Sequence, residues 1–315
     1  MATSERIDLE IERLSNTQEN RITNQIGRFL DKSGMRCTGE GSKYETLQAK
    51  RDEGAKGSQE THDGVKFFSY NTEDSAISCF RQFMRFEYNE YGLKQIEQTK
   101  PEMIKAFAVH LVDVGASQNT FSKYMTALAK LDNILEKATG VKVNWENTLK
   151  EVRPMVKDCP NKEHSRAYDN PRAIINELTG NEKIAAQLQL FCGLRISDAT
   201  YISADRWDAR TGEGVANSKG GQKIVFRPPA SVAAAITAEI NENGKFSAKD
   251  YSEALKGACE RVGEDWNGTH GMRHNFCQER MESYTKSGLS YREALSRTSE
   301  DMGHHRPEIT EHYLR

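Results

Sequence analysis

Residues 302–314 read MGHHRPEITEHYL, and this stretch near the end of the chain decides how the rest of the sequence is interpreted. It contains Gly303-His304 and, nine residues after that histidine, Tyr313. A tyrosine in such a place is by itself most simply a packing residue, because its ring is a large apolar surface. Its significance therefore depends on the other polar groups that the sequence supplies in a fixed order.

Three more short patterns precede this stretch in the C-terminal half of the chain. In chain order they are Gly193-Leu194-Arg195-Ile196-Ser197-Asp198, Ser218-Lys219-Gly220-Gly221 and His270-Gly271-Met272-Arg273. Each has a plain structural interpretation when taken singly: a surface or ion-paired arginine, a solvated turn lysine, and a chance His-x-x-Arg. All of them in this order, with the interval from His304 to Tyr313 kept, are far less expected by chance.

In this set and order the sequence resembles the tyrosine recombinase (integrase) family. That family has an arginine that opens a helix, a lysine on a β-hairpin, His-x-x-Arg, Gly-His, and a tyrosine nine residues after that histidine. The resemblance covers residues 170–315 well, the helical block 66–140 in type and position, and residues 1–65 hardly at all. It implies a site-specific DNA recombinase of a mobile genetic element, in which Tyr313 forms a 3′-phosphotyrosyl intermediate. It further implies a tetramer that pairs two DNA sites and exchanges strands through a Holliday junction.

The chemistry of phosphoryl transfer explains why two arginines belong to such a set. Charge accumulates on the non-bridging oxygens of a phosphodiester when another oxygen attacks it. A guanidinium can bind those oxygens with paired hydrogen bonds at fixed geometry. We therefore assign this role to Arg195 and Arg273. We expect His304 to make a further hydrogen bond to the phosphate. Asp198 is expected to orient a neighbouring group rather than to react.

The remaining groups would move protons. A phenol such as Tyr313 is a weak nucleophile unless a base or cations assist it, and His270 is the candidate base or hydrogen-bond partner. The leaving 5′-oxygen needs a proton, which Lys219 on a hairpin could supply as general acid. The phosphotyrosyl link would preserve the bond energy, so we expect no cofactor and no metal. Rival side chains for these roles are Lys223, His274 and His305.

Composition alone does not point to DNA. The 315 residues include 44 Lys and Arg against 46 Asp and Glu, for a formal net charge of −2, whereas DNA-binding domains usually have excess positive charge. A basic face can nevertheless coexist with an acidic back. The six cysteines form no Cys-x-x-Cys pair, and neither a secretory signal nor an apolar membrane segment is visible. We therefore expect a cytoplasmic protein that associates with the nucleoid when bound to DNA.

The apolar periodicity predicts a mainly α fold in several parts. We expect an N-terminal helix and flexible connector over 1–65, a helical (SAM-like) core-binding DNA domain over 66–153, and a proline-rich linker over 154–171. The catalytic domain over 172–315 would be α-rich with a small antiparallel sheet, including a hairpin of 213–217 and 222–227. Residues 1–32 are either an arm that binds separate DNA or a partner subunit, or a plain structural helix.

The DNA contacts of the first domain are indicated only by scattered basic residues. Together the two domains would clamp the duplex, and phosphate contacts would supply most of the affinity. Accessory DNA-bending or directionality proteins are possible partners. The candidate phosphate-binding residues of the first domain are Arg81, Lys123, Lys130 and Lys142.

The sequence departs from the family pattern in two places, and two rival functions are compatible with it. Only Leu314 and Arg315 follow Tyr313, whereas family members commonly have a further segment that docks on a neighbouring subunit; either this contact is absent or the chain has been shortened. Residues 200–206 are more polar than is usual in the family, so the sequence does not decide whether the first strand of the sheet forms.

The rival functions are a type IB topoisomerase-like or telomere-resolvase enzyme, and a non-catalytic DNA-binding protein with this fold.

Overall fold

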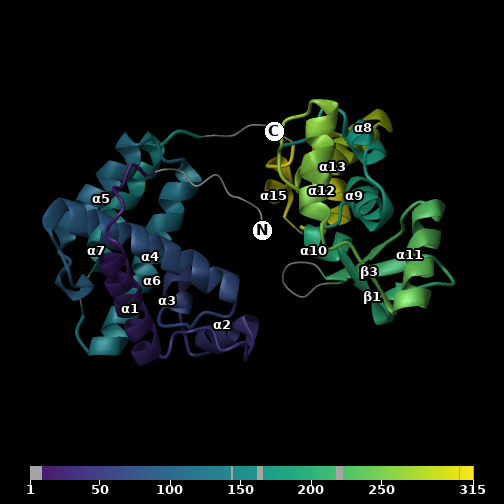
Figure 1. The fold of residues 1–315 in the computed structure, drawn as a ribbon. Coiled ribbons are helices and arrows are strands. Elements are labelled where there is room, and N and C mark those ends of the chain that lie inside the picture. The colour runs from purple at the N-terminus through teal and green to yellow at the C-terminus, as the bar shows by residue number, and fades with distance from the viewer. Residues whose placement is uncertain (1–8, 143–144, 162–165, 218–222, 305, 315) are drawn as a thin grey trace. The chain divides into compact units, whose positions relative to one another are not determined.

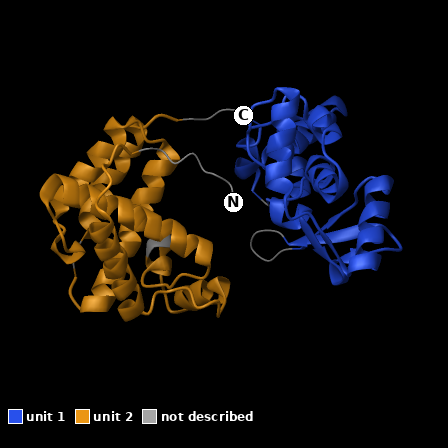
Figure 2. Cartoon of the chain, in the orientation of Figure 1, with its two compact units in different colours: residues 1–4, 163–315 blue, residues 5–162 orange. Residues whose placement is uncertain are grey.

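The computed structural model of the chain describes residues 9–142, 145–161, 166–217, 223–304 and 306–314. It is mainly α-helical with small antiparallel sheets, which confirms the predicted fold class (Figure 1). The chain divides between residues 162 and 163 into two compact units, which we call the N-terminal unit and the C-terminal unit (Figure 2). None of the described helices is long and apolar enough to span a membrane.

The N-terminal unit is built of helices around one hydrophobic core. Phe83 lies near its centre, with its ring 5.1 Å from Phe107 and 6.2 Å from Trp145 between ring centroids, in edge-on geometry. Such aromatic pairs stabilise a core beyond the area that they bury. The elements of this unit are α1 (Asn16–Ser33), α2 (Lys43–Asp52), α3 (Gly57–His62), α4 (Tyr70–Tyr91), η1 (Ile96–Gln98), α5 (Pro101–Asp113), α6 (Gln118–Thr139), α7 (Trp145–Val152) and η2 (Arg153–Asp158).

The first helix is part of this core rather than a free arm. Helix α1 begins at Asn16 because Ser15 and Gln18 form a capping box, in which each side chain binds the other residue's backbone N–H. Its buried side chains Ile22, Ile26, Phe29 and Leu30 join the core cluster of the unit, and the helix packs against α4 and α6. Residues 16–33 thus pack as part of the unit, as the structural-helix interpretation expects. Part of the expected flexible connector is ordered as α2 and α3.

The C-terminal unit is organised around α13, which packs against α9 (Figure 1). Helix α14 also packs against α13. Its helices are α8 (Pro171–Asn176), α9 (Gly180–Cys192), α10 (Ile196–Ala199), η3 (Ala204–Arg206), α11 (Ala230–Asn243), α12 (Tyr251–Val262), α13 (Gly271–Lys286), α14 (Tyr291–Asp301) and α15 (Pro307–Glu311). Its strands are β1 (Tyr201–Ser203), β2 (Trp207–Asp208), β3 (Glu213–Asn217), β4 (Lys223–Phe226) and β5 (Lys245–Ser247).

These strands form two small antiparallel sheets. Strands β2, β3 and β4 make one sheet, in which Val215 is opposite Val225, and this confirms the expected hairpin. Strand β1 pairs with β5, with Ile202 opposite Phe246. Both of these side chains are fully buried, at 1% and 0% exposure. Burial of this one apolar pair explains why β1 forms although its neighbours in the sequence are polar.

We predict that truncating Leu30 to alanine destabilises the N-terminal unit by about 2–5 kcal/mol, the usual cost of removing a fully buried leucine side chain. Leu30 has 0% exposure. Urea unfolding monitored by fluorescence would measure the change, with the exposed Asn20→Ala as the control, which should shift stability by less than about 0.5 kcal/mol. Equal stabilities of the two variants would restore the interpretation of α1 as an arm.

Candidate active site

One face of α13 presents the polar residues of the predicted site. His270 is the N-cap of this helix, and Arg273, His274 and Cys277 follow at the spacing that places side chains on one helical face. Arg273 and His274 are only 2% and 6% exposed. The predicted His-x-x-Arg pattern is therefore the start of a buried polar stripe, whose partners come from α9 and from the C-terminal segment.

The guanidinium of Arg273 joins α13 to two other parts of the chain, the end of α9 and residues 302–304. Nη1 donates a hydrogen bond to the carbonyl of Gly193, and Nη2 donates to the carbonyl of Met302 at 2.7 Å. Nη2 also lies 3.0 Å from Nε2 of His304. Its Nε is buried without a hydrogen-bond partner, an arrangement that costs about 1–3 kcal/mol unless an acceptor is supplied.

Gly193 is fitted to this contact by its backbone. It ends α9 in the left-handed region, at φ 61°, which favours glycine. A Cβ at this position would lie 2.4 Å from the ring of Phe276, which also belongs to α13. The close approach of α9 to α13 directs the carbonyl of Gly193 at Arg273. Arg195 follows Gly193 two residues later in the sequence.

His304 is held in one orientation by both of its ring nitrogens. Since a guanidinium can only donate, Nε2 of His304 accepts from Arg273. Its Nδ1 then carries the proton and donates to Oγ1 of Thr310, 3.0 Å away. Thr310 lies on the short helix α15, so this hydrogen bond fixes the helix that precedes Tyr313.

Tyr313 packs into the same cluster. Its ring centroid is 4.5 Å from that of His274 and 5.0 Å from that of His304, and the Arg273 guanidinium carbon lies 5.7 Å from the ring centroid. The Sγ of Cys277 contacts the carbonyl of Thr310 at 3.9 Å and so ties α15 to α13. The nine-residue interval from His304 to Tyr313 is thus spanned by one short helix that returns the tyrosine to the histidine.

Arg195 and His270 complete the group of predicted residues that this unit brings together. Arg195 is the N-cap residue of α10, and its side chain is partly exposed. Burial, reinforced by the positive charges of Arg166, Arg273 and Arg195, lowers the pKa of His270 to about 4. Nδ1 of His270 is buried without a hydrogen-bond partner. The rival His274, whose pKa is also lowered to about 4, chiefly by burial, makes the ring contact with Tyr313.

The predicted lysine falls outside the described residues, but its hairpin is anchored beside the site. Lys219 lies in the segment 218–222, of which the structure gives no description, as it gives none of His305. Asp198, 4% exposed, accepts hydrogen bonds from Nη2 of Arg206 at 2.6 Å and from the backbone N–H of Asn217 at 3.1 Å. Asp198 thus holds the last residue of β3, and the alternative Lys223 is exposed opposite it, at the start of β4.

The four basic residues proposed for DNA binding in the N-terminal unit have different surroundings. Lys130 donates to the carbonyl of Val65, and burial lowers its pKa to about 8. Lys142 is 3.9 Å from Glu136, Arg81 is partly buried, and Lys123 is exposed. Lys130 therefore has a structural contact of its own, whereas Lys123 is the more available cation.

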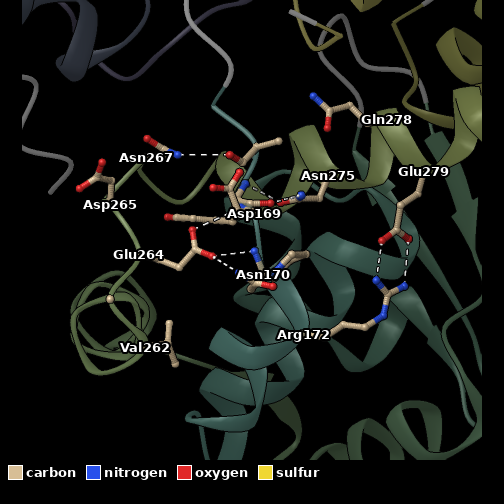
Figure 3. A pocket seen from close by; sticks show the side chains of 14 residues that line it. Asp169, Asn170, Arg172, Val262, Glu264, Asp265, Asn267, Asn275, Gln278 and Glu279 are labelled. Carbon is tan, nitrogen blue, oxygen red and sulfur yellow. Dashed lines mark hydrogen bonds and ion pairs between the residues drawn. The ribbon is translucent and has the colours of Figure 1, made fainter.

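A polar cavity of about 790 Å³ opens elsewhere in the C-terminal unit. It lies between the segment 167–172, the end of α12 and one side of α13, and its lining includes the carboxylates of Asp169, Glu264, Asp265 and Glu279 (Figure 3). Its lining does not include Arg195, Arg273 or Tyr313. This acidic cavity is distinct from the cationic cluster. Within the described residues, no three His, Cys, Asp or Glu side chains gather as metal ligands would.

Two contributors to the cluster were missed from the sequence. Thr310 orients His304, and Arg166 acts on the pKa of both His270 and His274. No motif marks either residue. Thr310 could have been found from its position between His304 and Tyr313, whereas Arg166 is more than 100 residues away from the histidines and is brought to them only by the tertiary fold.

We predict that His270 and His274 are neutral at pH 7 and titrate near pH 4. A folded pKa below the ordinary value of about 6.5 means that the unfolded chain takes up protons first, so stability falls as the pH drops from about 6.5 toward 4. NMR of the histidine Cε1–H resonances, assigned with His270→Asn and His274→Asn, would check this. Titration of both near 6.5 in the folded protein, as in the urea-unfolded chain, would contradict the site described here.

Comparison with solved structures supports the fold expected from the sequence, whereas comparison of sequences finds no relative. No protein-family model and no curated protein matches the chain. The structure is similar to XerH, a site-specific recombinase in a pre-cleavage complex with its difH substrate, at a TM-score of 0.56 and 15% identity, covering 97% of this chain and 96% of that one. The Tn1549 transposon integrase aligns with a TM-score of 0.48, 15% identity and 78% and 90% coverage. XerA recombinase aligns with a TM-score of 0.39, 13% identity and 93% and 94% coverage. The chain has the tyrosine recombinase fold, as the sequence predicted.

Proposed function

We propose that this protein is a site-specific DNA recombinase that cleaves and rejoins DNA strands through Tyr313. One observation carries the proposal: the buried Arg273, with an unpaired Nε, lies against the ring of Tyr313 and binds His304. An unpaired guanidinium N–H beside a hydroxyl nucleophile fits an anionic oxygen acceptor such as a phosphate. Arg195 and His270 belong to the same cluster.

In the proposed cleavage step, the Tyr313 hydroxyl oxygen bonds to the scissile phosphorus and the bond from phosphorus to the 5′-oxygen breaks. The phenolic proton passes to His270, which its lowered pKa keeps neutral and able to accept. The leaving 5′-oxygen takes a proton from a general acid. Rejoining reverses these transfers, with a 5′-hydroxyl attacking the 3′-phosphotyrosine, so the reaction needs neither ATP nor a metal ion.

The two arginines would stabilise the charge that develops on the non-bridging oxygens. Arg273 offers its Nε, and Arg195 is partly exposed at the start of α10. Because Arg273 is only 2% exposed, with Tyr313 packed over it, a phosphate reaches it after the segment around Tyr313 shifts. The bound phosphate would add a negative charge beside His270 and thereby raise the pKa of that histidine.

Lys219 is the proposed general acid. Its hairpin is tied to the site by the hydrogen bond from the Asn217 N–H to Asp198, two residues before the lysine. Asp198 is therefore proposed to position the lysine rather than to react. Lys223, on the opposite strand of the same hairpin, is the alternative acid.

The proposed substrate is a pair of double-stranded recombination sites. XerH was crystallised with its difH substrate before cleavage, and by this similarity we propose duplex DNA as the substrate here. The same proposal includes binding as a tetramer and strand exchange through a Holliday junction. It also includes accessory DNA-bending proteins as partners and a location in the cytoplasm on nucleoid DNA. Arg81, Lys123, Lys130 and Lys142 remain the proposed phosphate contacts of the N-terminal unit.

A topoisomerase-like enzyme with the same chemistry is the second candidate, because the Arg273–Tyr313 cluster alone would serve both. A supercoiled plasmid with two copies of the target site distinguishes them. Recombinant products and junction intermediates support the recombinase, whereas relaxation without any junction supports the topoisomerase.

We predict that Tyr313→Phe abolishes covalent attachment to DNA and changes DNA affinity by less than about tenfold, which is 1.4 kcal/mol, because only the nucleophilic oxygen is lost. A nicked suicide duplex and a denaturing gel measure the adduct. The exposed Tyr291→Phe is the matched control and should retain it. An adduct that persists in Tyr313→Phe, or that forms in no variant although DNA is bound, would overturn the proposal.

We predict that Lys219→Ala slows cleavage by about 10²–10⁴-fold, the usual contribution of a general acid. A substrate with sulfur at the 5′-bridging position should restore the rate, since a thiolate leaves without a proton. Lys223→Ala serves as the control. If the sulfur substrate rescues Lys223→Ala instead, the acid is Lys223, and rescue of neither variant would remove the hairpin lysines from this role.

A further inference from the structure

The segment from Arg166 to Asn170, which we call the strap, crosses the start of α13 without regular secondary structure. Its first residue follows the boundary between the two units. The side-chain amide of Asn275 binds the strap at two points, accepting from the N–H of Tyr168 at 3.0 Å and donating to its carbonyl at 2.7 Å (Figure 3). The Tyr168 hydroxyl donates to the carbonyl of Gly268 at 2.9 Å.

Further contacts fix both ends of the strap. Glu264 accepts from the backbone N–H groups of Asp169 and Asn170, at 3.2 and 2.7 Å. The side chain of Asn267 donates to the carbonyl of Ala167 at 3.2 Å. The two bonds between Asn275 and Tyr168 are buried, and buried, satisfied hydrogen bonds give an irregular segment a defined position. The strap is therefore a fixed platform.

This platform lies directly against the N-terminus of α13. A Cβ on Gly271 would lie 2.8 Å from the carbonyl oxygen of Arg166 and 2.3 Å from the ring of Tyr168. Only glycine permits this approach, and it sets Arg166 beside His270, the residue before Gly271. Among the neighbouring charges, that of Arg166 has the largest effect on the pKa of both His270 and His274.

Arg166 itself is an exposed cation with unused donors. Its Nε and Nη2 donate to one backbone carbonyl, that of Asn267, at 3.3 and 3.0 Å. In the described part of the chain its hydrogen bonds go to this carbonyl, and no carboxylate pairs with it. A guanidinium has five N–H groups, so three of them remain available. By contrast, Arg172 on the same stretch is paired with Glu279 at 2.8 and 3.3 Å (Figure 3).

We propose that Arg166 binds a backbone phosphate of the DNA next to the phosphate that Tyr313 attacks. The inference rests on the proposed function and adds a phosphate-binding residue to it. The strap holds the guanidinium beside the histidines of the site, and a charged, exposed and rigidly held fork of N–H groups matches two oxygens of one phosphate. The neighbouring cavity, lined by Asp169, Glu264 and Asp265, would repel the same anion, which limits the phosphate to the histidine side of the strap.

Binding in a Tyr313→Phe background separates this contact from the chemistry. We expect Arg166→Ala to reduce the slope of log affinity against log salt concentration by about 0.9, the contribution of one phosphate contact in B-DNA. Arg172→Ala, the control, should leave the slope unchanged. The probe is the nicked duplex on which the wild-type adduct forms, and thermal melting checks that each variant is folded.

Neutral methylphosphonates, placed singly along that duplex, then locate the contact. A methylphosphonate at one position near the nick should weaken DNA binding by the parent protein, which retains Arg166. The same methylphosphonate should not weaken binding by Arg166→Ala any further. The inference is wrong, and the proposed function stands, if the parent protein binds the duplex and Arg166→Ala keeps the parent's salt slope, as Arg172→Ala should. It is also wrong if every methylphosphonate affects Arg166→Ala as it affects the parent. If the wild-type protein forms an adduct on none of the duplexes that it binds, the proposed function fails, and this inference fails with it.

Discussion

The burial of one guanidinium, that of Arg273, is the constraint on which the rest of the C-terminal unit depends. Its N–H groups bind the carbonyl of Gly193 and, in a second segment, the carbonyl of Met302 and the ring of His304. Two segments distant in sequence are thus fixed to α13 around one charge. Removing a partner from a buried charge is strongly unfavourable. The left-handed end of α9, the N-terminal turn of α13 and the segment that carries Tyr313 are therefore held to one another by the same group that would bind the phosphate.

The concentration of cations explains how a chain with a net charge of −2 could hold the proposed anion site. Burial, reinforced by the charges of Arg166, Arg273 and Arg195, keeps the pKa of His270 near 4. A neutral histidine beside unneutralised guanidiniums is the state expected of a site that waits for a phosphate. Local placement of charge decides the electrostatics here, and overall composition gives little indication of it.

The sequence predicted the local elements better than it predicted their surroundings. The hairpin and the mainly α fold were recognisable, because strand alternation and helical periodicity are written in neighbouring residues. Helix α1 could not be assigned to the core, since its apolar face is equally suited to a partner. Arg166 was missed because its place beside His270 depends on Asn275 and Gly271, which hold the strap. The pattern selected His270, with His274 as a rival, and it could not show that the ring of His274 packs against Tyr313.

A crystal structure of the protein with a nicked duplex and orthovanadate would test the central claim most directly, because vanadate can adopt the five-coordinate geometry of the phosphoryl transition state. The account predicts vanadium bonded to the hydroxyl oxygen of Tyr313, with its equatorial oxygens within hydrogen-bond distance of both Arg195 and Arg273. Vanadate bound at another hydroxyl, or a Tyr313 that still packs over Arg273 while DNA occupies a different surface, would contradict it.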